Sequence, residues 1–571
     1  MNKILILDDT LVSKIAAGEV IERPASVAKE LVENSIDAGA RRISIEVKDG
    51  GKKLIKVTDD GCGMAPEDAK LSIQRHSTSK LRNINDLFSI RTLGFRGEAI
   101  PSIASVSKFE LITSDGGPNG TKMIVEGGKL VSHEKEGCPA GTSVTVEELF
   151  FNTPARLKFQ KSKSTELSHI IDIASKFVLS NPQISFKLKS DGQEALSSIG
   201  SGNLLEAIAS VYGTDMAKVM LKIGDETCLS ARQGSEMRGV KIHGYATQPV
   251  ITKSDRYGES FFVNGRFVRN ALLSRALEDA YRTLIPNGKY PVAVIFVEID
   301  PAEVDVNVHP AKREVKFSRP DMAMKAITSA VSASLGQINA EAGSKQFDGT
   351  QFAAFDRWQP EMIKIFGEMT NDKYQMTNEI PITNEQMGAL FQLNLTYIIL
   401  AKGEDLIMID QHAAHERIMY EKIKNNVISG IQTLLVPKTL EIEPKEFALI
   451  SGNLKEISQL GFDIEAFGRN TVMVRGIPAA LKIQNIDTAV SEILSELCSS
   501  FKIKSADERR EAVWKMMACK SAVKAGDKLS YVEMESLIRE LYSTSNPTTC
   551  PHGRPTLIKI SKPDMEKMFG R

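Results

Sequence analysis

Apolar and polar positions in the first third of the chain follow helical and strand periods in turn. Residues 25–38 repeat apolar or small side chains at the spacing of one helix face. Residues 43–47 and 55–58 instead alternate at every second position, which predicts strands. Glycine-rich breaks separate these elements. We therefore expect residues 1–210 to form one domain of mixed α/β structure.

Residues 211–340 show a second pattern of the same kind. Short apolar runs at 260–263 and 291–299 predict strands, and valines alternate with polar residues over 304–308. A helical period follows at about 320–340. These elements predict a second α/β domain.

The pattern weakens over residues 341–378, where Gly, Gln, Asp and Thr alternate with scattered aromatic residues. We expect a linker in this stretch. The apolar run at 397–409 then predicts paired strands near the start of a third unit, residues 379–571.

Length and composition are those of an ordinary globular protein. The 571 residues should hold about three or four domains. Lys+Arg and Asp+Glu are equal at 72 each, so any contact with DNA must come from local basic patches. Six scattered cysteines indicate a reducing compartment, and neither a signal peptide nor a membrane-length apolar run is evident. We expect a cytoplasmic protein that contacts no membrane.

Residues 410–421 are the densest cluster of potential metal ligands. They hold three carboxylates and two imidazoles, directly after the apolar run. If a helix begins after Asp410, His412 and Glu416 lie at i and i+4 on one face. Glu421 lies about 140° further around such a helix, so it is better suited to support ligands than to be one.

Two later segments add sulfur and imidazole donors. Cys519 lies in a helical pattern, and Cys550 and His552 form a Cys-Pro-His sequence near the end. With His412 and Glu416 they offer the ligand chemistry of a zinc or two-metal site. The alternative interpretation is a charged helix and two buried thiols.

A second group of polar residues indicates a nucleotide site. Glu30, Asn34 and Asp37 share one face of the helix at 25–38, and that face carries no lysine or arginine. A solvated acidic face would give the same pattern. At the end of the next strand, the carboxylate of Asp59 is placed to accept a hydrogen bond from an exocyclic amine, although Asp-Gly also favours a plain turn.

A glycine-punctuated loop at 94–99 leads into an apolar helix. Such loops present backbone amides to phosphate groups at a helix start. The loop fits neither the dinucleotide-binding G-x-G-x-x-G pattern nor the P-loop, so both of those nucleotide-binding classes are excluded on pattern.

Several motifs together resemble a known family. ELVENSIDA at 30–38, DDGCG at 59–63, GFRGEA at 94–99 and the segment 141–156 are similar to the ATP-binding motifs shared by gyrase B, Hsp90, histidine kinases and MutL. The segment 15–40, the NTPAR ending and VDVNVHPAK are most similar to the MutL family of DNA mismatch-repair proteins. DQHAAHERIMYE, ACK and CPHGRP resemble the endonuclease motifs of nicking MutL proteins.

The resemblance implies a fold class for each unit. Residues 1–210 would form an α/β sandwich of the gyrase B, Hsp90 and kinase (GHKL) ATPase type. Residues 211–340 would form a transducer α/β domain of the ribosomal-S5-like type. Residues 379–571 would form a C-terminal α/β domain that dimerises and carries a metal-dependent endonuclease.

The resemblance also implies roles at the ATP site. Glu30 would activate water as the general base, Asn34 would hold Mg²⁺, Asp59 would hold the adenine amine, and Lys312 of the second domain would reach the γ-phosphate. A solvated turn lysine is the alternative for Lys312. The remaining ATP-binding residues implied are Gly63, Thr78, Ser79, Lys80, Gly94, Phe95, Arg96, Gly97, Glu98, Ala99 and Thr142.

For the other sites the resemblance implies Zn²⁺ or Mn²⁺ at the endonuclease centre, with Asp410 and Glu416 catalytic. The residues that the resemblance assigns to this metal site are Asp410, His412, Glu416, Cys519, Cys550 and His552. Arg266 would bind DNA, and basic residues also cluster at 156–163. Gln432, Leu434, Leu435 and Pro437 resemble a motif that binds the sliding clamp, although a strand ending at proline would look the same.

The function implied is an ATP-driven homodimer that acts in DNA mismatch repair and nicks one strand. Its partners would be double-stranded DNA, a MutS-type mismatch-recognition protein and the sliding clamp, in the nucleoid region of the cytoplasm. One alternative is a non-nicking, ATP-switched matchmaker with a structural zinc site. A topoisomerase or chaperone with the same ATP fold is less well supported, since no active-site tyrosine context is evident.

Overall fold

The computed structural model describes most of the chain. The described residues are 21–75, 77–80, 92–94, 97–117, 119–224, 240–253, 255–282, 284–286, 288–305, 315–342, 390–426, 430–479, 481, 486–501, 505–523 and 526–569. They divide into two compact units. One comprises the described residues up to Ile338 with Thr439–Leu454 and Glu465–Met473, and the other comprises the rest. The expected linker lies outside the described residues from 343 on.

The first unit begins with an eight-stranded sheet of order β5-β4-β3-β6-β2-β1-β7-β8. Neighbouring strands are antiparallel except β1 and β7, which are parallel. The strands are β1 Arg42–Lys48, β2 Leu54–Asp59, β3 Lys108–Ser114, β4 Gly120–Glu126, β5 Lys129–Glu136, β6 Gly141–Glu147, β7 Ser185–Ser190 and β8 Gln193–Ser197.

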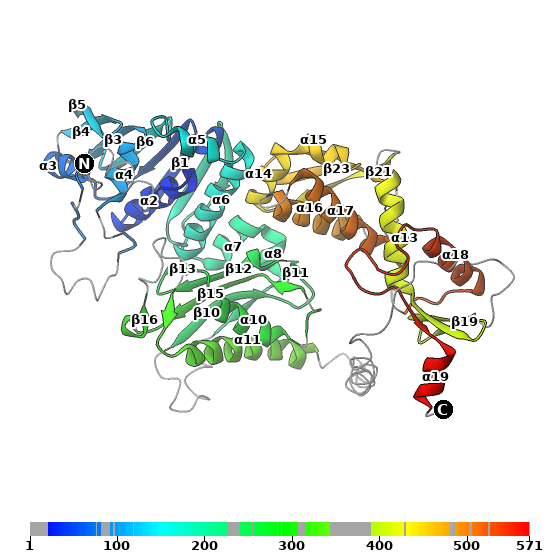
Figure 1. Ribbon diagram of the computed structural model, residues 1–571. Coiled ribbons are helices and arrows are strands. Elements are labelled where there is room, and N and C mark those ends of the chain that lie inside the picture. The colour runs from blue at the N-terminus through cyan, green and yellow to red at the C-terminus, as the bar shows by residue number, and fades with distance from the viewer. Residues whose placement is uncertain are drawn as a thin grey trace, which may run out of the picture. The chain divides into compact units, whose positions relative to one another are not determined.

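Helices cover this sheet, as Figure 1 shows for α2 and α6. The helices are α2 Pro24–Asp37, α3 Pro66–Ser72, α4 Ala99–Ser105, α5 Pro154–Phe159, α6 Lys163–Ser180, α7 Leu204–Tyr212 and α8 Thr214–Lys218, with the 3-10 turn η1 Asp49–Gly51. Proline at the first turn of α2 favours a helix start there, because its missing N–H has no partner at a helix N-terminus.

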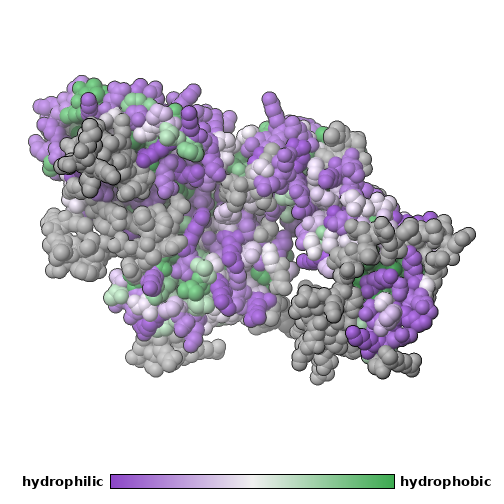
Figure 2. Space-filling view, viewed as in Figure 1, coloured by the Kyte–Doolittle hydropathy of each residue, from purple (hydrophilic) through white to green (hydrophobic). Residues whose placement is uncertain are grey.

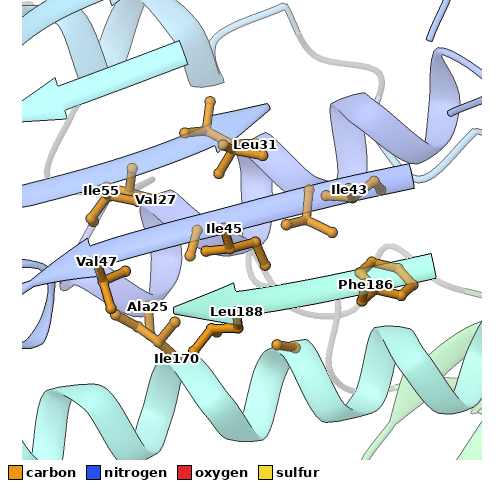
Figure 3. Close-up of a cluster of buried hydrophobic side chains, with 14 of the residues drawn as sticks. Ala25, Val27, Leu31, Ile43, Ile45, Val47, Ile55, Ile170, Phe186 and Leu188 are labelled. Atoms are coloured by element: carbon orange, nitrogen blue, oxygen red, sulfur yellow. The ribbon is translucent and has the colours of Figure 1, made fainter. Parts of the chain in front are cut away.

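The core between helix and sheet follows from the two predicted periods. Burial alternates along β1, so Ile43, Ile45 and Val47 face inward. They meet Leu31 of α2 and Ile170 of α6 in the cluster drawn in Figure 3. Loss of a buried leucine side chain at such a site costs about 2–5 kcal/mol. The predicted helix and strands of this domain are therefore confirmed, and this packing fixes the polar face of α2.

The second sheet of this unit has the order β13-β12-β15-β10-β9. Its strands are β9 Met220–Ile223, β10 Lys241–Thr247, β12 Glu259–Val263, β13 Arg266–Val268 and β15 Ala293–Glu298. Short pairs join β11 Thr252–Lys253 with β14 Tyr290–Pro291 and β16 Val304–Asp305 with β17 Lys316–Phe317, and η4 Arg256–Gly258 and η5 Pro301–Glu303 are 3-10 turns.

Two helices, α10 Ala271–Tyr281 and α11 Pro320–Ala342, share a core with this sheet. Strands β12 and β15 are parallel and α10 lies between them in sequence, which is the β-α-β arrangement of α/β domains. The strands predicted at 260–263 and 291–299 and the helix predicted at 320–340 are therefore confirmed. Of the alternating valines, Val306 and Val308 lie outside the described residues.

The C-terminal unit is built on a four-stranded antiparallel sheet of order β18-β19-β20-β24. Its strands are β18 Leu390–Leu393, β19 Tyr397–Lys402, β20 Asp405–Asp410 and β24 Leu557–Ile560. Helices α13 Gln411–Asn426 and α18 Tyr531–Tyr542 share a buried core with one face of this sheet. The paired strands predicted at 397–409, and a helix starting directly after Asp410, are confirmed.

Further helices in the C-terminal part are α16 Ile486–Phe501, α17 Ala506–Ser521 and α19 Lys562–Met568. A separate three-stranded sheet of order β21-β23-β22 joins Ile431–Glu441, Thr471–Pro478 and Asp463–Ala466. Helices α14 Pro444–Gly452 and α15 Leu454–Gln459 lie between its strands in sequence.

Hydrophilic residues dominate the surface seen in Figure 2, where hydrophobic residues gather only in small groups. Among the described helices, none combines the length and the apolar character needed to span a bilayer.

Candidate functional site

The acidic face of α2 has a lysine on its flank. Glu30, Asn34 and Asp37 lie on this face at the predicted spacing. Lys29 Nζ lies 3.1 Å from Glu30 Oε1 and 3.0 Å from Glu33 Oε1. Burial disfavours the ammonium, but the two carboxylates outweigh it and raise the pKa of Lys29. Glu30 is therefore a half-buried carboxylate with one side held by the Lys29 ammonium.

Asp37 ties two distant segments to the end of α2. Its Oδ2 accepts hydrogen bonds from Lys80 Nζ at 2.6 Å and from the backbone N–H of Gly94 at 3.0 Å. Its Oδ1 accepts the N–H of Leu93 at 2.9 Å. Lys80 Nζ also donates to Asn34 Oδ1 at 2.9 Å. The amide oxygen of Asn34 is therefore occupied by the Lys80 ammonium, which would have to move aside for this oxygen to bind a metal ion.

Asp59 sits at the end of β2 and is held by three donors. Ser35 Oγ donates to its Oδ2 at 2.7 Å, and the N–H groups of Gly61 and Thr142 donate to its Oδ1 at 2.9 and 3.3 Å. A carboxylate offers about four acceptor positions, so Oδ2 can accept one further hydrogen bond. The sequence does not single out Ser35, because a small side chain on the inner face of a helix gives no sign that its hydroxyl orients Asp59.

Gly63 allows the turn after Asp59 to approach β3. Its φ is +63°, and a Cβ placed on it would lie 1.8 Å from the carbonyl oxygen of Ser114. Only glycine fits such a position. Beside it, Thr142 Oγ1 lies 3.0 Å from Thr113 Oγ1, so the sheet presents hydroxyl groups next to Asp59.

The expected phosphate loops are described in part. The N–H of Lys80 donates to Thr78 Oγ1 at 3.2 Å, and Ser79 lies between them. Gly97 has φ +64°, and a Cβ there would lie 2.4 Å from the carbonyl oxygen of Ser77. Helix α4 begins at Ala99, with Glu98 at the position that precedes it. Three expected site residues, Phe95, Arg96 and Lys312, lie outside the described residues.

Arg266 of β13 points toward the same region. Its Nη2 donates to the carbonyl oxygen of Thr92 at 2.6 Å. Burial lowers the pKa of its guanidinium, and nearby Glu33 and Asp37 oppose that shift. The side chain expected to contact DNA is thus half-buried between the second domain and the segment that carries Gly94. No signal in the sequence indicates this contact, because it depends on how the two domains pack.

Five donor groups converge in the C-terminal unit. His412 Nε2 lies 3.3 Å from Glu416 Oε1 on α13, and His552 Nδ1 lies 3.2 Å from Glu416 Oε2. Two sets of donor atoms each lie within 4.8 Å of one another: one is His412, Glu416 and Cys519, and the other is Glu416, Cys550 and His552. Glu416 belongs to both sets, and its two carboxylate oxygens face different imidazoles, Oε1 that of His412 and Oε2 that of His552.

The elements around Glu416 explain this convergence. Cys519 lies in the last turn of α17, which packs on α13. Cys550 and His552 lie in a tight turn in which the N–H of Cys550 donates to the carbonyl oxygen of Arg554 at 2.8 Å. The chain then continues into β24, which pairs with β20 directly before α13. Three segments far apart in sequence therefore meet at one carboxylate.

Electrostatics favour an ionised Glu416 at this site. Burial opposes its ionisation, but hydrogen bonds with His412, His552 and Cys519 outweigh burial and hold the pKa of Glu416 well below its usual range. Hydrogen bonds to Cys519 and Glu416 raise the pKa of His412 to about 11. The side chain of Glu416 is 5% exposed, so its negative charge needs a cation beside it.

A backbone group orients one imidazole. His412 Nδ1 lies 2.8 Å from the carbonyl oxygen of Val523, which leaves Nε2 directed at Glu416. Metal-binding histidines commonly direct their other ring nitrogen to a carbonyl or carboxylate in this way. The set of two imidazoles, two thiols and one carboxylate fits Zn²⁺. Sequence reasoning missed Val523, since a backbone carbonyl leaves no residue-type signal.

Two other carboxylates of this motif, Asp410 and Glu421, have different positions. Asp410 Oδ1 accepts the N–H groups of His412 and Ala413 at 2.9 and 3.0 Å, so Asp410 caps the start of α13. It belongs to neither donor set among the described residues. Glu421 accepts hydrogen bonds from the N–H and Oγ of Ser545, which makes it a support for the chain before Cys550.

The expected surface sites are exposed to different degrees. In β21, an edge strand, Leu435 is fully exposed, Gln432 and Pro437 are exposed and Leu434 is half-buried. In the basic cluster at 156–163, Lys158, Lys161 and Lys163 are exposed, while Arg156 is half-buried beside Phe150. Lys163 also pairs with Asp191 at 3.1 Å.

Sequence models of three families match separate parts of the chain. Residues 22–137 match the histidine kinase-, DNA gyrase B- and HSP90-like ATPase family. Residues 208–336 match the C-terminal domain of DNA mismatch repair protein, and residues 390–529 match the MutL C-terminal dimerisation domain. With the sheets and helices described above, these matches confirm the expected fold class: a GHKL ATPase domain, an S5-like domain and a C-terminal dimerisation domain.

Solved structures similar to the N-terminal half include the N-terminal domain of a DNA repair protein, at 25% identity and a TM-score of 0.49, covering 58% of this chain and 99% of that one. The Aquifex aeolicus MutL ATPase domain complexed with ADP is 28% identical, with a TM-score of 0.37, and covers 49% of this chain and 94% of that one.

Curated relatives match over the full length. DNA mismatch repair protein MutL of Symbiobacterium thermophilum is 38% identical, with 100% of each chain covered. The protein of the same name from Bacillus anthracis is 38% identical and that from Geobacter sulfurreducens is 37% identical, again with 100% of each chain covered. The chain therefore belongs to the MutL family of DNA mismatch repair proteins.

Proposed function

We propose that this chain is an ATP-driven homodimer that nicks one strand of DNA during mismatch repair, through a metal site centred on Glu416. The observation that carries the proposal is the position of Glu416, whose two carboxylate oxygens face separate sets of donor groups. A single structural zinc ion needs one closed set of four ligands. Two sets that share a carboxylate suit a pair of ions, which is common among enzymes that cleave phosphodiesters.

Residues of this chain would hold the ions as follows. His412 and Cys519 would bind on one side of Glu416, and Cys550 and His552 on the other. Zn²⁺ suits the thiols and imidazoles, and Mn²⁺ suits carboxylate-rich positions. Bound there, divalent ions would polarise a phosphate oxygen and lower the pKa of a nearby water. Asp410 is assigned a catalytic role through its motif. Its cap on α13 supports that role, because it fixes the start of the helix and with it the position of His412.

ATP would bind at the face of α2. Glu30 would act as the general base, Asn34 would hold Mg²⁺, and the open acceptor position of Asp59 would take the adenine amine. Gly63 and Thr142 would line the adenine side. Thr78, Ser79, Lys80 and residues 94–99 would close on the phosphates, and Lys312 would reach the γ-phosphate from the second domain.

Dimerisation would use the outer face of the C-terminal sheet. Phe391, Ile399, Met408 and Ile558 stand in register across all four strands, on the face away from the buried core. Phe391 and Ile558 are 50% and 45% exposed. An apolar row across a whole sheet suits a second copy of the chain.

Other partners would bind at exposed surfaces. Double-stranded DNA would contact the basic cluster at 156–163 and Arg266. The sliding clamp would bind at Gln432–Pro437. A MutS-type mismatch-recognition protein would be a further partner. Phosphate contacts of this kind are not sequence-specific and weaken with salt.

The experiment that tests the proposal is nicking of supercoiled plasmid in Mn²⁺ by the native chain and by Glu416→Gln, Asp410→Asn and Glu535→Gln. Glu535 is a surface carboxylate paired with Arg539 and serves as the control. We expect nicking by the native chain and the control but not by the first two variants, with ATPase rates unchanged throughout. If none nicks even with clamp and ATP, the non-nicking matchmaker with a structural zinc site replaces the proposal.

A further inference from the structure

Helix α13 carries a polar residue on each side of Glu416. Successive residues of a helix lie roughly 100° apart around its axis, so His415 and Arg417 stand on opposite flanks of Glu416. Arg417 is 9% exposed and His415 is half-buried. Among the described residues, neither donor set includes His415, and a guanidinium has no lone pair for a metal ion. Any contribution of these two residues to the site therefore comes through the groups that they contact.

His415 holds the backbone of the segment that follows α17, the helix beside α13 in Figure 1. Its Nδ1 accepts the N–H of Val523 at 2.9 Å, while the carbonyl oxygen of the same residue lies 2.8 Å from His412 Nδ1. The two imidazoles are three positions apart on α13 and share a face. Together they fix both polar backbone groups of Val523, which lies just after the helix turn that carries Cys519. The end of α17, and with it the thiol of Cys519, is thereby held against His412.

Arg417 holds a different segment in the same manner. Its Nε donates to the carbonyl oxygen of Thr549 at 2.6 Å, and Thr549 directly precedes Cys550. A guanidinium is a rigid, permanently charged fork of donors, so its hydrogen bonds are strong and directional. The carboxylate of Glu421 supports this fork, since its Oε1 lies 3.9 Å from Arg417 Nη1. The tight turn with the second pair of donor groups is thus held against α13 from the other flank.

We propose that His415 and Arg417 are positioning residues of the metal site, and that each holds one of the two donor sets in place around Glu416. His415 acts on the set that contains Cys519, and Arg417 acts on the set that contains Cys550. A metal ion tolerates departures of only about 0.2 Å from its preferred ligand distances, so a donor segment that is loosely held binds it weakly. The inference rests on the proposed function, because it requires that this site binds metal.

The test is the affinity of the full chain for Zn²⁺, measured by competition with a chromophoric chelator in the absence of DNA and ATP. His415→Leu should bind Zn²⁺ roughly 10- to 100-fold more weakly, because loss of a group that orients metal ligands typically has this effect. His415→Asn should restore most of the affinity, since its amide oxygen can accept the N–H of Val523. His133→Leu is the matched control, because His133 is an exposed histidine of β5 in the ATPase domain.

The same measurement tests Arg417. Arg417→Leu should weaken Zn²⁺ binding by a similar factor, and Arg417→Lys should restore part of the affinity through an ammonium donor to Thr549. Arg539→Leu is the control, because Arg539 is an exposed arginine of α18 that pairs with Glu535. Circular dichroism of each chelator-treated variant shows whether it folds without metal. If Arg417→Leu does not fold, Arg417→Lys takes its place, and its Zn²⁺ affinity should lie below that of the native chain.

Double variants assign each positioning residue to its donor set. Changes within one set should not add, so His415→Leu with Cys519→Ser should weaken binding by less than the product of their separate factors. His415→Leu with Cys550→Ser should give the full product, and Arg417→Leu should show the reverse pattern.

Three results would overturn the proposal. They are native Zn²⁺ affinity in folded variants of both positions, equal losses in His415→Leu and His415→Asn, and coupling of each residue to both thiols. A native chain that takes up no Zn²⁺ would instead overturn the proposed metal site itself, and this proposal with it. The proposed function therefore fails in the native chain, whereas the positioning roles fail only in the variants.

Discussion

The guanidinium of Arg266 donates a hydrogen bond to the carbonyl oxygen of Thr92 at 2.6 Å. The backbone N–H groups of the two residues after Thr92 donate hydrogen bonds to the carboxylate of Asp37. This carboxylate also accepts a hydrogen bond from the Lys80 ammonium, which donates a second one to the amide oxygen of Asn34. A series of hydrogen bonds therefore leads from β13 of the second domain to the side chain proposed to hold Mg²⁺. We infer that Arg266, besides its proposed contact with DNA, couples the second domain to the ATP site through these hydrogen bonds.

Arg266→Gln should lower the ATPase rate without DNA on the order of tenfold, because a charged donor to Thr92 is lost. Arg269→Gln is the matched control, since Arg269 is exposed, lies three residues away and carries the same charge. The measurement is the ATPase kcat and KM of both variants, with DNA affinity at two salt concentrations. If the variants lose DNA affinity equally and both keep the native ATPase rate, Arg266 is a phosphate contact as the family motif implies.

Much of this site is predictable from sequence, and the limits have physical causes. The period of residues 25–38 predicts α2 and its polar face, because helix spacing is a local property. His412 and Glu416 follow from the same spacing, whereas Cys519, Cys550 and His552 join them only through packing of distant segments.

Contacts that depend on tertiary structure were not predictable. Lys80 reaches Asp37 across 43 residues, and the carbonyl of Val523 meets His412 across 111. Neither contact has a spacing or a residue pattern that a sequence could reveal. Asp410 shows a different limit: its residue type suits a helix cap and a metal ligand equally well.

Gly63→Ala should destabilise the ATPase domain by more than about 2 kcal/mol, because φ +63° is strained for alanine and its Cβ would overlap Ser114. Gly192→Ala is the control, since Gly192 has φ +86° but nothing within 4 Å of a Cβ. It should cost only about 1 kcal/mol. Urea denaturation followed by far-ultraviolet circular dichroism measures the stability of both variants. Equal losses of stability in the two variants would show that the close approach to Ser114 is unimportant.

Stability should depend on pH through the buried Glu259 of β12. Its pKa rises from 4.5 to about 7 on folding, so between these values the folded chain holds a proton that the unfolded chain has released. Stability therefore falls as pH rises through this window, by up to about 3 kcal/mol. Glu259→Gln should raise the melting temperature at pH 8 and change it little at pH 5. An equal shift at both pH values would mean that the buried charge is not the cause.

Removing metal should destabilise the C-terminal unit. If ions bind at Glu416, a chelator should lower its melting temperature, since a ligand present at 100 times its Kd stabilises a fold by about 2.7 kcal/mol. Cys550→Ser should lose most of this chelator effect, whereas Cys138→Ser, in the ATPase domain, should keep it. Calorimetry with and without Zn²⁺ measures the difference, and a melting temperature unaffected by chelator in the native chain would argue against bound metal.

The apolar row on the C-terminal sheet should control self-association. Phe391→Glu places a charge among Ile399, Met408 and Ile558, and burying an unpaired carboxylate in an interface costs several kcal/mol. The dimer should therefore dissociate at micromolar concentration by sedimentation velocity. Val250→Glu is the control, because Val250 is 91% exposed in the second domain and lies outside this row. Because the row lies on the face opposite the core around Leu400 and Ile407, the Phe391→Glu monomer should keep its fold and its zinc content. A variant that stays dimeric would place the interface on another surface of the C-terminal unit, and one that unfolds would show that the row is part of the core.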